Sequence, residues 1–320
     1  MNPLVSILIP MYNSEETIEE TLYSCLNQTY NNIEIIIVDD GSSDNSLEIV
    51  KGLQASNSNI KLFRQERKGA CRARNLAFKY SKGEYIQYLD ADDILSISKI
   101  EEQMVYASTL EPFVLFSCKW FRFEKTINKA KKNYLGIYKN YNEPANWLVD
   151  SWSGNGALQT ACWLSSRQLI EKAGDWNESL LKNQDGDFFC RVILNSKKIV
   201  FSNKAIVFYR DSGRNSISGT ISYKSALSTL KSYEFYRIYI EKYNREDLRI
   251  ALIGNYLNFY RYYYPLFPDL LKTAEEYINQ SGERAVLVTS NKYLKALSKV
   301  FGFKSTIIIE KTIRRMLSFR

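Results

Sequence analysis

Short apolar runs alternate with amphipathic stretches over the first ninety residues of the chain. Two of the runs, residues 4–10 and 33–38, are almost continuously apolar and rich in β-branched side chains, which is typical of strands buried on both faces of a sheet. The stretches between them place apolar side chains three or four positions apart, which predicts helices. The predicted strands are residues 4–10, 33–38, 60–64 and 84–89, and the predicted helices are residues 14–28, 46–55 and 70–83.

Two of the predicted helices carry end signals. Ser14 is the expected N-cap of the first helix, and Gly83 is the expected C-cap of the third. Strands and helices that alternate at this spacing indicate βαβ units. The sequence therefore predicts an α/β fold with a mostly parallel sheet flanked by helices.

Polar clusters follow three of the predicted strands. They are Pro-Met-Tyr-Asn at 10–13, Asp-Asp-Gly-Ser-Ser-Asp at 39–44 and Asp-Ala-Asp-Asp at 90–93. Ligands of parallel sheets bind beyond the carboxyl ends of the strands. We therefore expect the three clusters to meet at one ligand-binding edge.

The third cluster crowds Asp90, Asp92 and Asp93 into four positions. Its Asp-x-Asp spacing suits Mg²⁺ or Mn²⁺, which bind few protein carboxylates and complete their coordination with substrate phosphates. The alternative is a solvated turn, because Asp is common in turns. Asp93 is expected to cap the next helix rather than to bind metal.

The other clusters favour a nucleotide. The Tyr12 ring offers a stacking surface for a base, and the Asp39 or Asp40 carboxylate offers an acceptor for a base N–H or a ribose hydroxyl. Arg72 and Arg74 are candidate ligands of a diphosphate. Neither GxGxxG nor GxxxxGK[ST] occurs, so dinucleotide and P-loop sites lose their main support.

Composition narrows the chemistry further. The chain contains no histidine, so acid–base work must fall to Asp, Glu, Lys, Tyr or Cys. Its five cysteines are scattered without a CxxC pair, which favours buried thiols in a reducing compartment. No leader peptide and no apolar run of 18 residues is recognisable, so we expect a cytoplasmic protein.

The surplus of positive charge lies in one segment. Residues 221–320 hold 17 Lys and Arg against 9 Asp and Glu, which accounts for the whole net charge of +8. This segment is helical in pattern and rich in tyrosine. Three interpretations stay open: helices packed against a catalytic domain, contact with an anionic membrane at the inner face of the cytoplasmic membrane, and self-association. No nucleic-acid-binding module is recognisable.

Several motifs together resemble family 2 glycosyltransferases with the GT-A fold. The first half carries "VSILIPMYNSEETIEETLYSCLNQTYNNIEIIIVDDGSSDNS", then "ARN" and "GEYIQYLDADD". The second half carries "QTACWLSSRQLIEKAGDWNESLLKNQDGDFFCRVIL" and "AIVFYRDSGRNSIS". The resemblance spans roughly residues 3–218. It implies a GT-A domain at 1–220, with a nucleotide-sugar half at 1–110 and an acceptor half at 111–220, followed by a helical C-terminal region at 221–320.

The resemblance also implies an activity and residue roles. The activity is inverting transfer of a sugar from a nucleotide donor, usually UDP-linked, to a hydroxyl of a saccharide or lipid-linked acceptor, with Mn²⁺ or Mg²⁺ as cofactor. Such enzymes build cell-surface polysaccharides and glycolipids. The roles are Pro10, Tyr12 and Asp40 for the base, Asp90 for the ribose, Asp92 for the metal and Asp185 as catalytic base.

Two positions depart from the family pattern. Gln184 stands before Asp185 where the family has Glu. Asp211 follows Tyr-Arg close to where many members have a metal-ligating histidine, and it is a candidate oxygen ligand. Trp152 and Asp187 are further candidates for contact with the acceptor.

Two other functions remain as alternatives. A sugar-1-phosphate nucleotidyltransferase would use a similar fold and acidic metal ligands, but it needs a basic, glycine-rich loop after the first strand, where "PMYNSEET" is acidic. A nucleotide-sugar-binding scaffold without activity would not need both Asp92 and Asp185.

Overall fold

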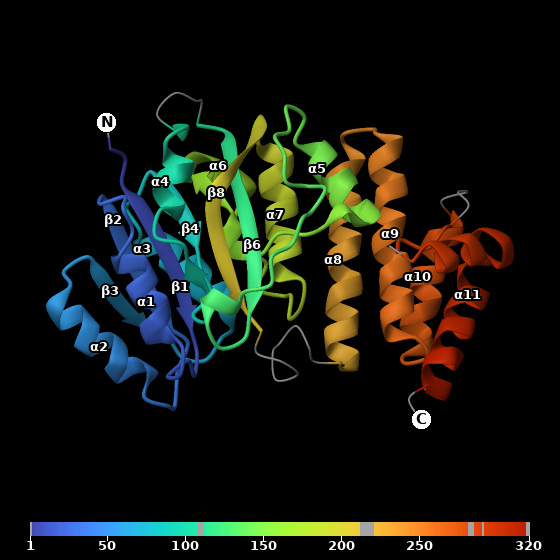
Figure 1. The fold of residues 1–320 in the computed structure, drawn as a ribbon, viewed down its shortest axis with the longest axis horizontal. Helices are drawn as coiled ribbons and strands as arrows, with labels where there is room; N and C mark the ends of the chain where they lie inside the picture. Colours follow the sequence, from blue (N-terminus) through green and yellow to red (C-terminus); the bar gives the residue numbers. More distant parts are fainter. Residues whose placement is uncertain (1, 108–111, 212–220, 281–284, 290, 318–320) are drawn as a thin grey trace. The chain divides into compact units, whose positions relative to one another are not determined.

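The apolar runs of the first ninety residues form neighbouring parallel strands at one end of an eight-stranded sheet (Figure 1). The computed structural model describes residues 2–107, 112–211, 221–280, 285–289 and 291–317. The chain divides into two units, each treated separately below. The first unit is Met1–Pro144, Leu158–Ser179 and Gln184–Ser216, and the second is Ala145–Ala157, Leu180–Asn183 and Ile217–Arg320.

The sheet belongs to the first unit and has the order β3-β2-β1-β4-β7-β6-β8-β5. Strands β3, β2, β1 and β4 run parallel, whereas β7 is antiparallel to both of its neighbours. The strands are β1 Val5–Met11, β2 Ile33–Asp39, β3 Ile60–Arg64, β4 Tyr85–Tyr88, β5 Ile94–Leu95, β6 Val114–Phe123, β7 Leu164–Ser166 and β8 Lys198–Arg210. The predicted α/β fold with a mostly parallel sheet is confirmed.

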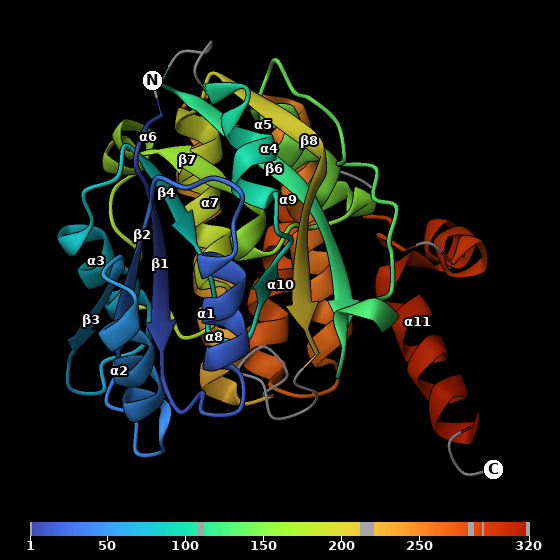
Figure 2. The same ribbon diagram turned by 60° about the vertical axis from the view of Figure 1, so that its left-hand side comes forward.

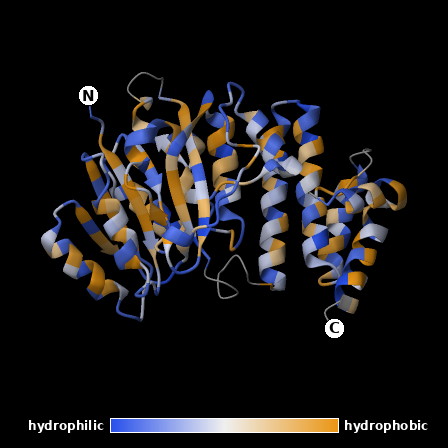
Figure 3. Cartoon of the chain, viewed as in Figure 1, coloured by the Kyte–Doolittle hydropathy of each residue, from blue (hydrophilic) through white to orange (hydrophobic). Residues whose placement is uncertain are grey.

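Helices cover both faces of the parallel strands. Right-handed crossovers place α1 and α2 on one face and α3 on the other (Figures 1 and 2). The described helices of this unit are α1 Ile18–Leu26, α2 Ser46–Ser56, α3 Ala70–Tyr80, α4 Lys99–Met104, α6 Arg167–Ala173 and α7 Gln184–Asn195, with 3₁₀ turns at Ile127–Lys129 and Thr160–Cys162. Hydrophobic residues colour the strands almost throughout (Figure 3), as expected for a sheet with two covered faces.

Three expected helix ends are wrong. Helix α1 begins at Ile18 instead of after Ser14, because residues 15–17 form a turn that precedes the helix. Helix α3 ends at Tyr80 with Ser81 as its C-cap, so Gly83 lies outside it. The residues after Asp93 form the short strand β5, which pairs with β8, and the next helix begins only at Lys99.

The second unit is helical. Its elements are α5 Ala145–Asp150, a π turn at Ser151–Asn155, α8 Tyr223–Glu241, α9 Glu246–Tyr263, α10 Pro268–Gln280 and α11 Lys292–Leu317. Aromatic side chains hold α8, α9 and α10 together, since Tyr233 packs against Tyr256 and Phe259, and Tyr256 stacks on Tyr277. The predicted helical C-terminal region is confirmed. No helix within the described residues is long and apolar enough to span a membrane.

All five cysteines are buried free thiols, as the sequence predicts. Burial raises the pKa of Cys25 and Cys71 to about 12. These thiols therefore stay protonated at neutral pH and act as small apolar side chains.

Candidate active site

The carboxyl ends of β1, β2 and β4 bring the three polar clusters to one edge of the sheet. Met11 pairs with Asp39, and Leu8 pairs with Tyr88, so the strands end at similar heights. The Leu89 N–H donates to the Leu8 carbonyl (3.0 Å) and continues the ladder up to Asp90. The predicted convergence of the clusters thus follows from the parallel register.

The loops after β1 and β2 are interlocked by reciprocal hydrogen bonds. The Ser43 N–H donates to the Asn13 side-chain oxygen (2.9 Å), and the Asn13 N–H donates to the Ser42 hydroxyl (2.9 Å). The Glu15 N–H donates to the Asp44 carboxylate (3.0 Å). Polar side chains of each loop therefore bind N–H groups of the other loop. The N–H of Glu15 is bound by Asp44 in this way, and Ser14 does not serve as the N-cap of α1.

Asp40 organises the loop before α3. It is buried, and its carboxylate accepts hydrogen bonds from the Gln65 side chain (2.7 Å) and from the N–H groups of Lys68 (2.7 Å) and Gly69 (2.8 Å). Asp39 is fully buried and lies 3.1 Å from Arg64 Nε. The binding of a base by Asp40 stays a prediction. In the structure its carboxylate holds the segment between β3 and α3 in place.

Tyr12 and Pro10 lie at the end of β1, both partly exposed. The Arg67 guanidinium lies over the Tyr12 ring, 4.2 Å from its centroid. This contact shows that the ring presents a face to a planar group. A base that stacked on the same face would displace Arg67.

Arg74 connects the two motif-bearing halves of the site. It is buried, and its guanidinium donates to Asp90 (2.7 Å) and to the Gln184 side chain (3.4 Å) while it lies over the Trp176 ring. Burial alone would lower the pKa of Arg74, but the Asp90 carboxylate raises it. One cation thereby joins the aspartate cluster to the start of α7.

The aspartate cluster is a crowded set of negative charges. Burial and the charge of Asp90 raise the pKa of Asp92 to about 6, and burial with both neighbours raises the pKa of Asp93 well above its usual range. Arg210 braces the cluster, because its N–H donates to Asp93 (3.0 Å) and its Nε donates to the Asp92 carbonyl (2.9 Å). Asp93 is thus an anchor for β8 and not a helix cap.

Asp185 lies in the first turn of α7, one residue after the contact with Arg74. Its side chain is partly exposed. Burial and the charge of Asp90 raise its pKa, whereas the Gly186 N–H and Arg74 act in the opposite direction. A carboxylate with a raised pKa beside an open edge has the properties of a proton acceptor.

Other predicted residues occupy less direct positions. Arg72 is half-exposed and lies 3.7 Å from Glu178, and Asp211 lies 3.3 Å from Arg122 at the end of β8. Among the described residues, no group of three or more Cys, Asp or Glu side chains is arranged to hold a metal ion. The metal role of Asp211 and the diphosphate role of Arg72 stay predictions.

Both candidate acceptor residues are buried. Asp187 has no exposed area and pairs with Arg191 (3.0 Å), which also binds the carbonyls of Ala173 and Asp175. Trp152 is stacked on Tyr236 in the second unit. Contact with an acceptor stays a prediction for both, and their present partners give them roles in packing.

The sequence did not predict the hydrogen bonds of Arg210 to Asp92 and Asp93, or the ion pair of Arg191 with Asp187. The available signal for Arg210 was the Tyr-Arg pair at the end of an apolar run, a place where a polar side chain reaches the sheet edge. For Arg191 the signal was its position four residues after Asp187 on a predicted helix.

The α/β sheet, with its aspartate cluster at the carboxyl ends of the parallel strands, is a fold of the GT-A type. The chain belongs to glycosyl transferase family 2, whose model matches residues 6–173. It is therefore a glycosyltransferase, as the resemblance implied.

Curated relatives agree with this assignment. The glycosyltransferase GlyG of Streptococcus pneumoniae is 43% identical over 223 residues, which cover 66% of this chain and 71% of GlyG. The Escherichia coli UDP-Glc:α-D-GlcNAc-diphosphoundecaprenol β-1,3-glucosyltransferase WfgD is 49% identical over 102 residues, which cover 32% of this chain and 40% of WfgD.

Solved structures share the fold. The first 349 residues of Staphylococcus aureus TarS, crystallised with UDP-GlcNAc, superpose with a TM-score of 0.73 at 18% identity, covering 98% of this chain and 92% of that one. The mannosyltransferase PcManGT of Pyrobaculum calidifontis, in complex with GDP-Man and Mn²⁺, gives 0.56 at 15% identity, covering 97% and 85%.

Proposed function

We propose that this glycosyltransferase transfers a sugar from a UDP-linked donor to a hydroxyl of a saccharide or lipid-linked acceptor, with inversion at the anomeric carbon. The observation that carries the proposal is the bridge made by Arg74 between Asp90 and Gln184. Through this bridge one cation contacts both Asp90 and the residue before Asp185, which supports a site shared by the two motifs. The UDP-glucose specificity in the name of WfgD and the UDP-GlcNAc bound to TarS support a UDP-linked donor.

The nucleotide would occupy the edge formed by β1, β2 and β4. Pro10, Tyr12 and the loop held by Asp40 would surround the base, and Asp90 would accept a ribose hydroxyl. Arg74 would remain beside the diphosphate, where its fixed charge opposes that of the leaving group. Arg72 is exposed enough to contact the same group after it leaves Glu178.

Asp92 fits the role of a ligand to Mg²⁺ or Mn²⁺. Burial, and after it the charge of Asp90, raises the pKa of Asp92, and a divalent cation at this position would offset both effects. A site with Asp92 as one protein ligand and Asp211 as a candidate for a second suits a cation that also binds the donor phosphates. When bound, the cation supplies positive charge that stabilises the departing nucleoside diphosphate.

Asp185 would act as the catalytic base. The acceptor oxygen forms a bond to the anomeric carbon as the bond to the diphosphate breaks on the opposite face, and the hydroxyl proton passes to the Asp185 carboxylate. The raised pKa of Asp185 favours this transfer. Its position at the start of a helix that Arg74 contacts keeps it oriented.

The acceptor is proposed to be part of a growing cell-surface glycan. WfgD is named for a lipid-diphosphate-linked acceptor, which supports a similar acceptor class here. We also propose that the basic second unit contacts an anionic membrane surface. Helix α11 carries exposed apolar side chains at Ile313 and Met316 beside Lys and Arg, which supports such contact.

Activity and binding measurements on three variants test the catalytic roles. Release of UDP from UDP-sugars, and transfer to an added acceptor, should require Mn²⁺ or Mg²⁺ and stop on chelation. Asp185→Asn should lower transfer by about 10²–10⁴-fold while donor affinity stays within a few-fold. Asp92→Ala should remove the metal-dependent part of UDP binding measured by calorimetry.

Asp175→Asn, at an exposed aspartate of the same unit, is the matched control and should retain transfer. Full activity of Asp185→Asn would refute its role as base. Formation of UDP-sugar from sugar-1-phosphate and UTP would identify a nucleotidyltransferase instead. Donor binding without UDP release or transfer in the wild type would identify a scaffold.

A further inference from the structure

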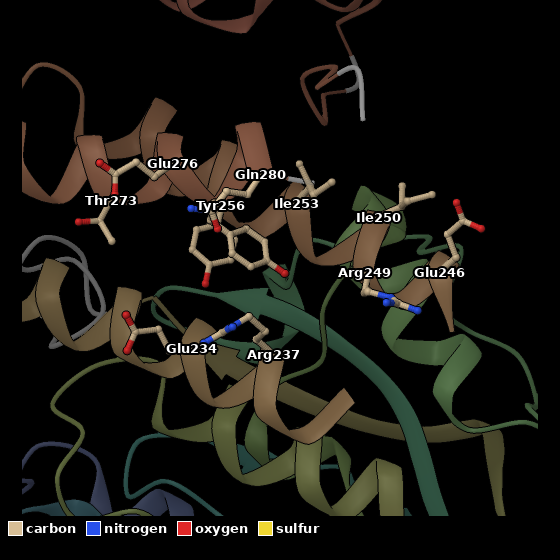
Figure 4. A pocket seen from close by; sticks show the side chains of 11 residues that line it. Glu234, Arg237, Glu246, Arg249, Ile250, Ile253, Tyr256, Thr273, Glu276 and Gln280 are labelled. Carbon is tan, nitrogen blue, oxygen red and sulfur yellow. The ribbon is translucent and has the colours of Figure 1, made fainter. Parts of the chain in front are cut away.

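A cavity of about 650 Å³ lies in the second unit among α8, α9 and α10 (Figure 4). Its volume falls in the range of small-molecule sites, about 300–1,000 Å³. In Figure 4, Tyr256 lies in the middle of the cavity, with Arg237 on one side and Glu276 on the other. Three helices therefore supply the walls of one concave, polar site.

Tyr256 brings a hydroxyl group to this cavity. Its side chain is 2% exposed and stacks on Tyr277, with ring centroids 4.0 Å apart. No hydrogen-bond partner for the Tyr256 hydroxyl exists among the described residues. The hydroxyl belongs to a residue that lines the cavity, so it can donate to or accept from a molecule bound there.

The charged side chains of the cavity are kept apart. Arg237 and Arg249 lie close enough to Tyr277 to lower its pKa against the larger effect of burial. Yet neither arginine forms an ion pair with Glu234, Glu246 or Glu276 within the part of the chain that the structure describes. Arg249 donates to the Asn244 side chain (3.1 Å) and Glu276 lies 4.0 Å from Lys272, so the charged groups best placed to meet an occupant are Arg237, Glu234 and Glu246.

We propose that this cavity binds an uncharged saccharide segment. Three carboxylates and two guanidinium groups line it, so their charges nearly cancel and neither a polyanion nor a polycation is favoured. A sugar hydroxyl both donates and accepts, which matches this mixture of groups. Ile250, Ile253 and the tyrosine rings face the cavity as well, and they suit the apolar C–H faces of a sugar ring.

This inference rests on the proposed function and makes it more specific. The segment would be a part of the acceptor or product glycan remote from the reacting hydroxyl, and its binding would favour long acceptors over short ones. Binding energy from a remote part of a substrate lowers KM for that substrate. Donor hydrolysis, which needs no acceptor, would not depend on the cavity.

The test uses the full chain and a panel of neutral tri- and tetrasaccharides of hexoses and N-acetylhexosamines at millimolar concentration, with binding followed by saturation-transfer NMR. Arg237→Gln should weaken binding about tenfold or more, as expected for loss of a charge-assisted hydrogen bond. Tyr256→Phe keeps the ring packing and should weaken binding by a few-fold. Arg315→Gln, at an exposed arginine of α11 outside the cavity, should leave binding unchanged.

The same variants should raise KM for long acceptors only, with UDP release from the donor unaltered. Equal binding by Arg237→Gln and wild type would overturn the inference, as would binding of inorganic diphosphate in place of saccharides. Failure of every saccharide to bind while UDP release persists would overturn the inference and leave the proposed function standing. Saccharide binding without UDP release from any donor would instead refute the proposed function.

Discussion

At the scale of single residues, Lys99 places an ammonium group inside the core of the first unit. Its side chain has no exposed area, and Nζ donates to the Gln87 side-chain oxygen, which is also buried. Burial lowers the pKa of Lys99 to about 8, although the nearby thiols of Cys118 and Cys162 act in the opposite direction. A neutral amide partner does not compensate a buried charge as a carboxylate would.

This predicts a pH-dependent contribution to stability with a definite sign. Between pH 8 and the unperturbed value of about 10.4, the unfolded lysine holds a proton that the folded one has lost, so stability rises with pH. Lys99→Met removes the effect. The difference in unfolding free energy, wild type minus Lys99→Met, should increase by about 1 kcal/mol per pH unit across this window.

Urea unfolding of both proteins at several pH values between 7 and 10 measures that difference. A difference that stays constant, or falls, with rising pH would contradict the assignment of a lowered pKa to Lys99.

At the scale of elements, Gly83 is required by a close approach of two chain segments. A Cβ atom there would lie 2.4 Å from the Ser6 hydroxyl and 2.5 Å from the Ser6 backbone nitrogen. The Gly83 N–H also donates to the Ser6 hydroxyl (2.8 Å). The glycine therefore lets the connection from α3 to β4 pass directly over β1.

Gly83→Ala should destabilise the protein by about 1–3 kcal/mol, because backbone atoms of β1 must move to accommodate the methyl group. Gly52→Ala is the matched control, since Gly52 lies within α2 and a Cβ there has no neighbour within 4 Å. That change should stabilise by about 0.5–1 kcal/mol through helix propensity. Thermal unfolding of the two variants measures the difference in their stability. Equal melting temperatures would contradict the close approach of the chain segments at Gly83.

The elements also show what the sequence could and could not predict. The strands β1 and β2 were predictable because each is an almost continuous apolar run, β3 and β4 because they are short and rich in apolar and aromatic residues, and the ligand-binding edge followed from their parallel order. The start of α1 was not, because Asp44 in a different loop binds the N–H of Glu15. A local pattern contains no information about a partner that only the tertiary fold brings near.

The same limit applies to the candidate site. Asp90, Asp92 and Asp185 could be proposed because their motifs are contiguous in sequence. That Arg74 would join Asp90 to Gln184, 110 residues away, required the fold. Asp187 was a candidate for contact with the acceptor, but it lies two positions after Asp185, on a different face of α7, where it is buried against Arg191.

At the scale of the whole molecule, the positive charge of the last hundred residues coincides with an exposed apolar helix face. Helix α11 exposes Ile309, Ile313 and Met316, which are spaced four and three positions apart and therefore share one side of the helix. Lys304, Arg314 and Arg315 belong to the same helix. Apolar side chains flanked by basic ones are typical of helices that lie in the interface of an anionic bilayer.

Ile313→Ser combined with Met316→Ser should therefore weaken binding to anionic vesicles by about tenfold or more, since each apolar side chain removed from water contributes about 1 kcal/mol or more. Leu227→Ser with Ile238→Ser, at two exposed apolar positions of α8, is the matched control and should bind as the wild type does. Co-sedimentation with phosphatidylserine-containing vesicles at low salt provides the measurement, and phosphatidylcholine vesicles provide the neutral reference.

Added salt should weaken binding of wild type and variants alike, because the basic side chains act through screened charge. UDP release should be unchanged in both double variants, since the substituted residues all belong to the second unit and the residues proposed for donor chemistry belong to the first. If the full chain ignores anionic vesicles at low salt, the basic helical region serves packing or self-association and the membrane proposal is refuted.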